Sequence, residues 1–210
     1  MARLAHDDGI RHIVATPHFN HNYQPERSVV EERVTSLQNT LDQHQINVRI
    51  YPGHEVRIEN PSFIYEHIKN ERIAYIGNEG RFILLEQRWT QYEEKSIEII
   101  RWFMKQGIRP IIPHPERHFF FRESPHLLTE LIKQGAWTQV SCDSLIGKNN
   151  TDALEFSKWL AKQDLIHILA TDAHSVKRKP NLSEGYRVIR EWCGKDRIEA
   201  IDQRAQIFLT

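Results

Sequence analysis

Short apolar segments alternate with longer amphipathic ones along most of the chain. Six of the apolar segments are typical of buried or half-buried β-strands; they cover 12–16, 47–53, 81–86, 108–113, 137–141 and 165–171. The amphipathic stretches predict helices over 26–44, 61–69, 91–106, 125–134, 152–163 and 181–193. Because strands and helices alternate, we expect an α/β protein with a parallel sheet, either a (β/α) barrel or a doubly wound fold.

Two glycines support the ends assigned to these helices. Gly107 and Gly135 each follow a predicted helix, after "MKQ" and "IKQ", where a C-terminal cap is expected. The chain has 210 residues and shows no linker, repeat or low-complexity tract. We therefore expect a single domain over residues 1–210.

The overall charge excludes some classes of partner. Lys and Arg total 28, as do Asp and Glu, so bulk attraction to nucleic acid or to an anionic membrane is not expected. No apolar run approaches the roughly 20 residues that span a bilayer, which predicts no membrane insertion. Only two cysteines occur, Cys142 and Cys193, far apart, which indicates a reducing compartment and a cytoplasmic protein without a thiolate zinc site.

Histidine and acidic residues occur where five successive predicted strands end. These residues are His18, Glu55, Glu86, His114, Asp172 and His174. Parallel strands bring such ends to one face, where the active sites of α/β proteins lie. Nitrogen and oxygen ligands without sulfur favour manganese, iron or zinc, with more than one ion allowed. Considered alone, His18 is more typical of a turn residue than of a metal ligand. Asp172 and His174 could likewise belong to a turn that leads into the next helix.

The segment "IPHPERH" at 112–118 closes one predicted strand with a histidine between two prolines. Proline fixes its own φ and favours extended geometry in the residue before it. We therefore expect His114 to be held on a stiff, extended backbone, with Arg117 three residues later. Other histidines lie within strands or helices and are interpreted as structural or solvated: His12, His44, His67, His126 and His167.

Five segments in fixed order resemble a known family: "GIRHIVATPHFN", "YPGHEVRI", "FILLE", "IIPHPER" and "ILATDAHS". They look like the polymerase-and-histidinol-phosphatase (PHP) superfamily. Within it they are similar to the bacterial manganese-dependent tyrosine-protein phosphatases encoded with capsule and exopolysaccharide genes. The resemblance covers nearly the whole chain and implies a distorted, TIM-like (β/α) barrel.

The resemblance also implies a site and a reaction. By position, the family's metal ligands match His18, Glu55, Glu86, His114, Asp172 and His174. The family holds two or three divalent ions, with Mn²⁺ the first expectation and iron or zinc the alternatives. Arg117 and Arg178 match positions that hold the phosphate, for which the guanidinium fork is suited. The implied activity is hydrolysis of phosphotyrosine on protein, and the implied partner is an autophosphorylating bacterial tyrosine kinase.

The family pattern has one departure at the start of the chain. Members open with a strand that carries His-x-His and a loop with Asp-Asp-Gly, and neither precedes "MARLAHDDGI". "HDDG" at 6–9 is expected to end a helix capped by Gly9, so His6, Asp7 and Asp8 are not counted as ligands. We expect the barrel to lack its first strand, which weakens metal binding and favours instability or a homo-oligomer.

Other functions remain as alternatives. A cysteine-dependent phosphatase needs an arginine six positions after the thiolate, but Cys142 is followed there by Lys148 and Cys193 by Glu199. Hydrolysis of histidinol phosphate would use the same metal chemistry. A remnant with an incomplete site would bind phosphotyrosine without hydrolysing it. In that case "HFFF" at 118–121, with Trp89 and Tyr92, would offer an apolar surface, although core or oligomer packing is its commoner role.

Overall fold

Parallel strands run through the middle of the molecule in the computed structural model, which describes residues 1–77 and 79–209. Within these residues the strands are β1 (His12–Ala15), β2 (His18–Phe19), β3 (Arg49–Pro52), β4 (Glu55–Arg57), β5 (Phe82–Glu86), β6 (Arg109–Pro113), β7 (Trp137–Ser141) and β8 (Ile168–Ala170). β1 pairs with β3, and the other strands form one sheet in the order β2-β4-β5-β6-β7-β8. The expectation of an α/β protein with parallel strands is therefore confirmed.

The two sheets are continuous along the chain, because β1 leads directly into β2 and β3 leads directly into β4. β1 and β2 are separated only by Thr16 and Pro17, and β3 and β4 only by Gly53 and His54. A Cβ atom at Gly53 would lie 3.0 Å from side-chain atoms of both Val14 and Ile76, so the chain passes closely there. Among the described residues, the hydrogen-bonded order does not join β8 back to β1 or β2. The backbone pairing thus shows parallel sheets and not a closed barrel.

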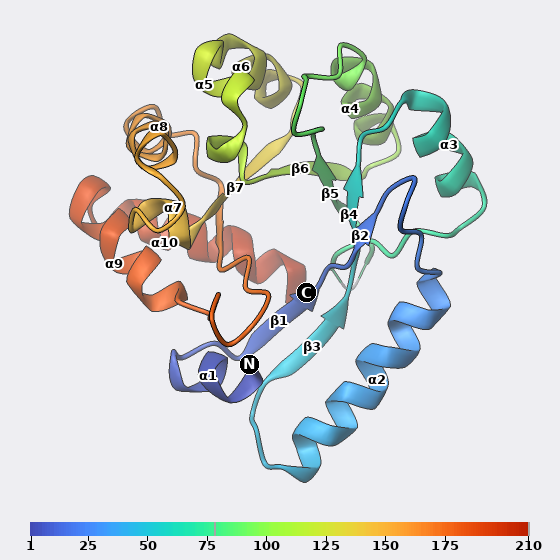
Figure 1. The fold of residues 1–210 in the computed structure, drawn as a ribbon, viewed down its shortest axis with the longest axis vertical. Helices are drawn as coiled ribbons and strands as arrows, with labels where there is room; N and C mark the ends of the chain where they lie inside the picture. The colour runs from blue at the N-terminus through green and yellow to red at the C-terminus, as the bar shows by residue number, and fades with distance from the viewer. Residues whose placement is uncertain (78, 210) are drawn as a thin grey trace.

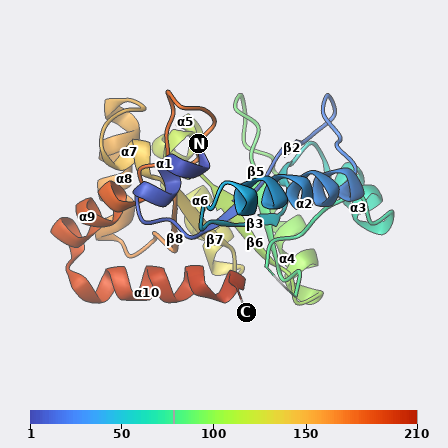
Figure 2. The ribbon, with the colours of Figure 1, turned by 90° about the horizontal axis from the view of Figure 1, so that it is seen from below.

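Helices lie around the outside of the strands (Figure 1). Their bounds are α1 (Ala2–Asp7), α2 (Arg27–Gln43), α3 (Pro61–Lys69), α4 (Ser96–Lys105), α5 (Phe119–Glu123), α6 (Pro125–Lys133), α7 (Cys142–Leu145), α8 (Thr151–Lys162), α9 (Leu182–Cys193) and α10 (Lys195–Gln206), with 3₁₀ turns η1 (Pro115–Arg117) and η2 (Ile207–Leu209). Figure 2 shows α10 on the side of the molecule away from α1 and α2. No helix in the described residues is long and apolar enough to cross a bilayer.

Strand alternation divides the apolar side chains between two sides of the sheet. Ile83 and Leu85 of β5 join the large cluster that packs under the helices, together with Phe103 of α4. Phe82 and Leu84 of the same strand belong to a smaller cluster on the other side. The strands are thus covered on both faces, as parallel sheets require.

The expected elements were found with shifts of up to five residues at their ends, the largest at the start of α4. All six predicted strands and six predicted helices are present, and Gly107 and Gly135 have φ of 75° and 103°, which suits the caps expected there. α1 ends before Gly9, whose φ is 89°, as expected for "HDDG". The short strands β2 and β4 and the helices α5, α7 and α10 were not expected from the sequence.

Candidate metal centre

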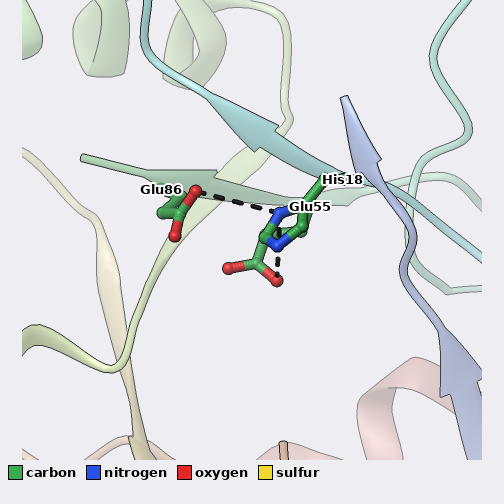
Figure 3. A group of neighbouring side chains, drawn as sticks. All are labelled: His18, Glu55 and Glu86. Atoms are coloured by element: carbon green, nitrogen blue, oxygen red, sulfur yellow. Dashed lines mark ion pairs between the residues drawn. The ribbon is translucent and has the colours of Figure 1, made fainter. Parts of the chain in front are cut away.

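Three ligand-type side chains meet where β2, β4 and β5 lie side by side (Figure 3). His18, Glu55 and Glu86 each offer one atom, and these atoms all lie within 4.8 Å of one another. His18 Nδ1 is 4.0 Å from Glu55 Oε2 and 3.9 Å from Glu86 Oε2. The register explains the meeting, because His18 is paired directly with Glu55 and the next strand is β5, which ends at Glu86.

His114 adds a fourth side chain to this cluster from the end of β6. Its Nε2 lies 2.9 Å from Glu55 Oε1 and 3.7 Å from Glu86 Oε1. The expectation of an extended backbone at His114 is wrong, because its φ of 36° and ψ of 49° are left-handed. The chain turns sharply here between Pro113 and Pro115, and this turn carries the imidazole to Glu55. A left-handed histidine before proline is strained, so the packing around it must hold it in place.

The charges in the cluster influence one another strongly. Burial would raise the pKa of Glu55, but the hydrogen bond and charge of His114 outweigh it, so the pKa of Glu55 is lowered. The pKa of Glu86 is raised by burial and by the nearby Glu55 carboxylate. Arg57 partly offsets this, with Nε and Nη2 each 2.9 Å from Glu86 Oε2. Two buried carboxylates this close repel each other, so additional positive charge nearby would stabilise them.

The donor set fits a divalent cation. Two carboxylates and two imidazoles without sulfur suit manganese, iron or zinc. His18 Nδ1, which faces both carboxylates, is buried and has no hydrogen-bond partner. A buried polar atom without a partner is costly, and a cation would satisfy it. The residues therefore fit a metal ion because of their charge, their donor chemistry and the unpartnered nitrogen of His18.

The remaining expected residues form a second group. Arg117 Nη1 lies 2.9 Å from Asp172 Oδ2, and Arg178 Nη2 contacts the same oxygen. Asp172 follows β8 and has a left-handed backbone, with φ of 49°. His174 Nδ1 is 2.8 Å from the Asp172 carbonyl oxygen, and its side chain is exposed. The structure thus gathers His18, Glu55, Glu86 and His114 in one group, and Asp172, His174 and both arginines in another.

Three polar residues of these groups were missed by the sequence analysis. Arg57 lies two positions after Glu55, and strand alternation places such residues on one face, so this signal was available. Asp143 Oδ2 lies 3.9 Å from Arg178 Nε, and Asn181 donates a hydrogen bond to Asp143 Oδ1 at 2.8 Å. No sequence pattern marks Asp143 or Asn181, because they lie 38 residues apart and meet only in the fold.

Cys142 has the properties of a buried structural thiol. Its side chain is fully buried at the start of α7, and burial raises the pKa of the thiol. A nucleophilic cysteine needs the opposite shift, toward the thiolate. This environment agrees with the sequence argument against a cysteine-dependent phosphatase.

Comparisons with known proteins agree with the sequence resemblance. Residues 1–207 match the family described as "Capsular polysaccharide synthesis, CpsB/CapC". The tyrosine-protein phosphatase YwqE of Bacillus subtilis is 31% identical over 211 residues, which cover 100% of this chain and 82% of that protein. The putative tyrosine-protein phosphatase CapC of Staphylococcus aureus is 32% identical over 181 residues, covering 86% and 70%.

A solved structure extends the similarity to three dimensions. It belongs to a study of YwqE from Bacillus subtilis and CpsB from Streptococcus pneumoniae, described as unique metal-dependent tyrosine phosphatases. It superposes with a TM-score of 0.93 at 30% identity and covers 100% of this chain and 86% of that one. On the agreement of sequence, fold and family match, the chain belongs to the CpsB/CapC family of capsular polysaccharide synthesis.

Proposed function

We propose that this protein is a metal-dependent phosphatase that hydrolyses phosphotyrosine on protein and regulates capsule or exopolysaccharide synthesis. The observation that carries the proposal is the cluster of His18, Glu55 and Glu86 beside two converging arginines. The relatives named as tyrosine-protein phosphatases support the same activity. A site with this composition suits a phosphate monoester, because it offers cation ligands and guanidinium groups together.

The proposed metal ligands are the four clustered residues, with Asp172 and His174 completing the set for two or three ions. Mn²⁺ is the proposed ion, with iron or zinc as alternatives. A divalent ion bound there would act as a Lewis acid and lower the pKa of a bound water. Arg57, by its contact with Glu86, would hold that carboxylate in its present orientation.

Arg117 and Arg178 are the proposed phosphate-binding residues. Both guanidinium groups now contact one oxygen of Asp172. Guanidinium donors that converge on a carboxylate oxygen can also bind the oxygens of a phosphate, and they favour the charge that builds up during phosphoryl transfer. Asp143 and Asn181 would keep Arg178 aimed at this position.

Several broader features belong to the same proposal. The parallel strands would form the distorted, TIM-like barrel of the PHP type, with residues 1–210 as one domain. The protein would act in the cytoplasm, alone or as a homo-oligomer. Its partner would be a tyrosine-phosphorylated protein such as an autophosphorylating bacterial tyrosine kinase.

The test is hydrolysis of a phosphotyrosyl peptide with and without added Mn²⁺. We expect Mn²⁺ to stimulate hydrolysis by the unchanged protein, and His114→Ala to abolish it because an imidazole of the cluster is removed. His126→Ala is the matched control, since His126 is an exposed histidine on α6, and it should keep full activity. Peptide binding without hydrolysis at any Mn²⁺ concentration would overturn the proposal and leave a phosphotyrosine-binding protein. Faster hydrolysis of histidinol phosphate than of the peptide would place the substrate among small phosphomonoesters.

A further inference from the structure

Trp89 is a large apolar side chain that lies exposed beside the charged site. It follows β5 by three residues, and 39% of its surface is exposed. Its indole stacks on His114, with ring centroids 5.3 Å apart and planes at 10°. The guanidinium carbon of Arg117 lies 4.9 Å from the indole centroid. The indole therefore adjoins both a proposed metal ligand and a proposed phosphate-binding residue.

The indole is held in place by a row of aromatic rings. His118 stacks against Trp89 at 4.6 Å, and Phe120 stacks against His118 at 5.1 Å. His118 and Phe120 are buried, so the row connects the exposed indole to the core. A side chain supported in this way loses little conformational freedom when a ligand binds to its exposed surface.

We propose that Trp89 binds the phenyl ring of phosphotyrosine and makes the site selective for aryl over alkyl phosphates. The inference rests on the proposed phosphatase function and names a residue that determines its specificity. In an aryl phosphate the ester oxygen is bonded directly to the ring, so a phosphate at Arg117 brings the ring to the adjacent indole. An indole offers a phenyl ring both apolar area and a favourable stacking geometry. An alkyl phosphate gains no stacking from the same contact.

A purely structural role for Trp89 would have a different signature. If the indole only positioned Arg117 and His114, its removal would weaken every phosphate ligand to the same degree. If it binds the aryl ring, its removal would weaken aryl ligands more than alkyl ligands. The ratio of the two affinities therefore separates the two roles.

The experiment is calorimetric titration of the Mn²⁺-loaded protein with phenylphosphonate and methylphosphonate, which carry the same charged group. We expect the unchanged protein to prefer phenylphosphonate and Trp89→Leu to reduce this preference about fivefold. Trp89→Phe should retain most of the preference, because a ring remains. Phe119→Leu is the matched control, since Phe119 is an aromatic residue on α5 that is 41% exposed and whose ring packs against Phe120. This variant should leave the preference unchanged.

The possible outcomes distinguish failure of the Trp89 inference from failure of the proposed phosphatase function. An equal loss of affinity for both phosphonates in Trp89→Leu would overturn the inference and leave a positioning role. A preference that falls in Phe119→Leu instead would also overturn it and place the aryl ring on α5. If the unchanged protein hydrolyses the phosphotyrosyl peptide yet shows no preference for phenylphosphonate, the inference fails alone. If it neither hydrolyses the peptide nor binds either phosphonate, the proposed function fails as well.

Discussion

His167 should make the protein less stable in mild acid. It is half-buried just before β8, where its Nδ1 accepts a hydrogen bond from the Thr138 backbone N–H at 3.2 Å. Burial, with the positive charges of Arg204 and Arg109, lowers the pKa of His167 to about 4. The unfolded chain should titrate near pH 6.5. Between these values the unfolded state binds more protons, so the stability from the neutral imidazole is complete above pH ~6.5 and is lost as the pH falls toward 4.

The size of this effect follows from the two pKa values. The pKa of His167 is about 6.5 in the unfolded chain and about 4 in the folded chain. Protonation therefore lowers the free energy of unfolding by about 2 kcal/mol between pH 8 and pH 5. The variant His167→Asn removes the titration and keeps an acceptor for the Thr138 N–H. Urea unfolding at pH 8 and pH 5 should therefore show that the unchanged protein loses about 2 kcal/mol more than the variant.

An exposed histidine provides the control for the His167 measurement. His126→Asn replaces an exposed histidine on α6. Between pH 8 and pH 5, this variant should lose as much stability as the unchanged protein. If the unchanged protein and His167→Asn lost the same free energy of unfolding, the reasoning would be refuted. His167 would then have the same pKa in the folded and unfolded chains.

Three further predictions concern the core, a helix cap and the phosphate site. Phe103→Ala should lower the free energy of unfolding by about 3–5 kcal/mol in urea, because this fully buried ring joins α4 to the sheet; a loss below 1 kcal/mol would contradict the packing. Asn60→Ala should cost about 1 kcal/mol by the same measurement, because Asn60 Oδ1 accepts from the Phe63 N–H at the start of α3; Asn60→Asp, which keeps the acceptor, should be close to neutral. Arg117→Lys should lower kcat/KM for a phosphotyrosyl peptide about tenfold or more, because the planar fork is lost; unchanged kinetics would remove Arg117 from the site.

The fold could be predicted from the sequence because its signals are local. The apolar run 81–86 and the helix 61–69 each carry their pattern within a few residues, and the observed elements β5 and α3 follow them closely. β2 and β4 were missed because they are two and three residues long, too short to show a period. α10 was missed because its buried residues are few, with Ile198 and Ile201 facing the core.

The meeting of four candidate ligands could be predicted from the sequence, but the detailed contacts of the candidate site could not. Strand ends indicated that His18, Glu55, Glu86 and His114 would meet, and parallel pairing brings them together. The left-handed turn at His114 opposes the local preference before proline, so only the surrounding packing explains it. The joint contact of Arg117 and Arg178 with Asp172 depends on loops that are distant in sequence, which no local pattern encodes.

The most direct test of the metal centre is anomalous X-ray scattering at the manganese edge from crystals soaked in Mn²⁺. We expect an anomalous peak bounded by His18, Glu55 and Glu86. The peak should disappear in Glu55→Gln, which removes a charged ligand with little change in shape. Anomalous peaks that occur only elsewhere on the protein, or a peak that persists unchanged in Glu55→Gln, would show that this cluster is not the metal centre.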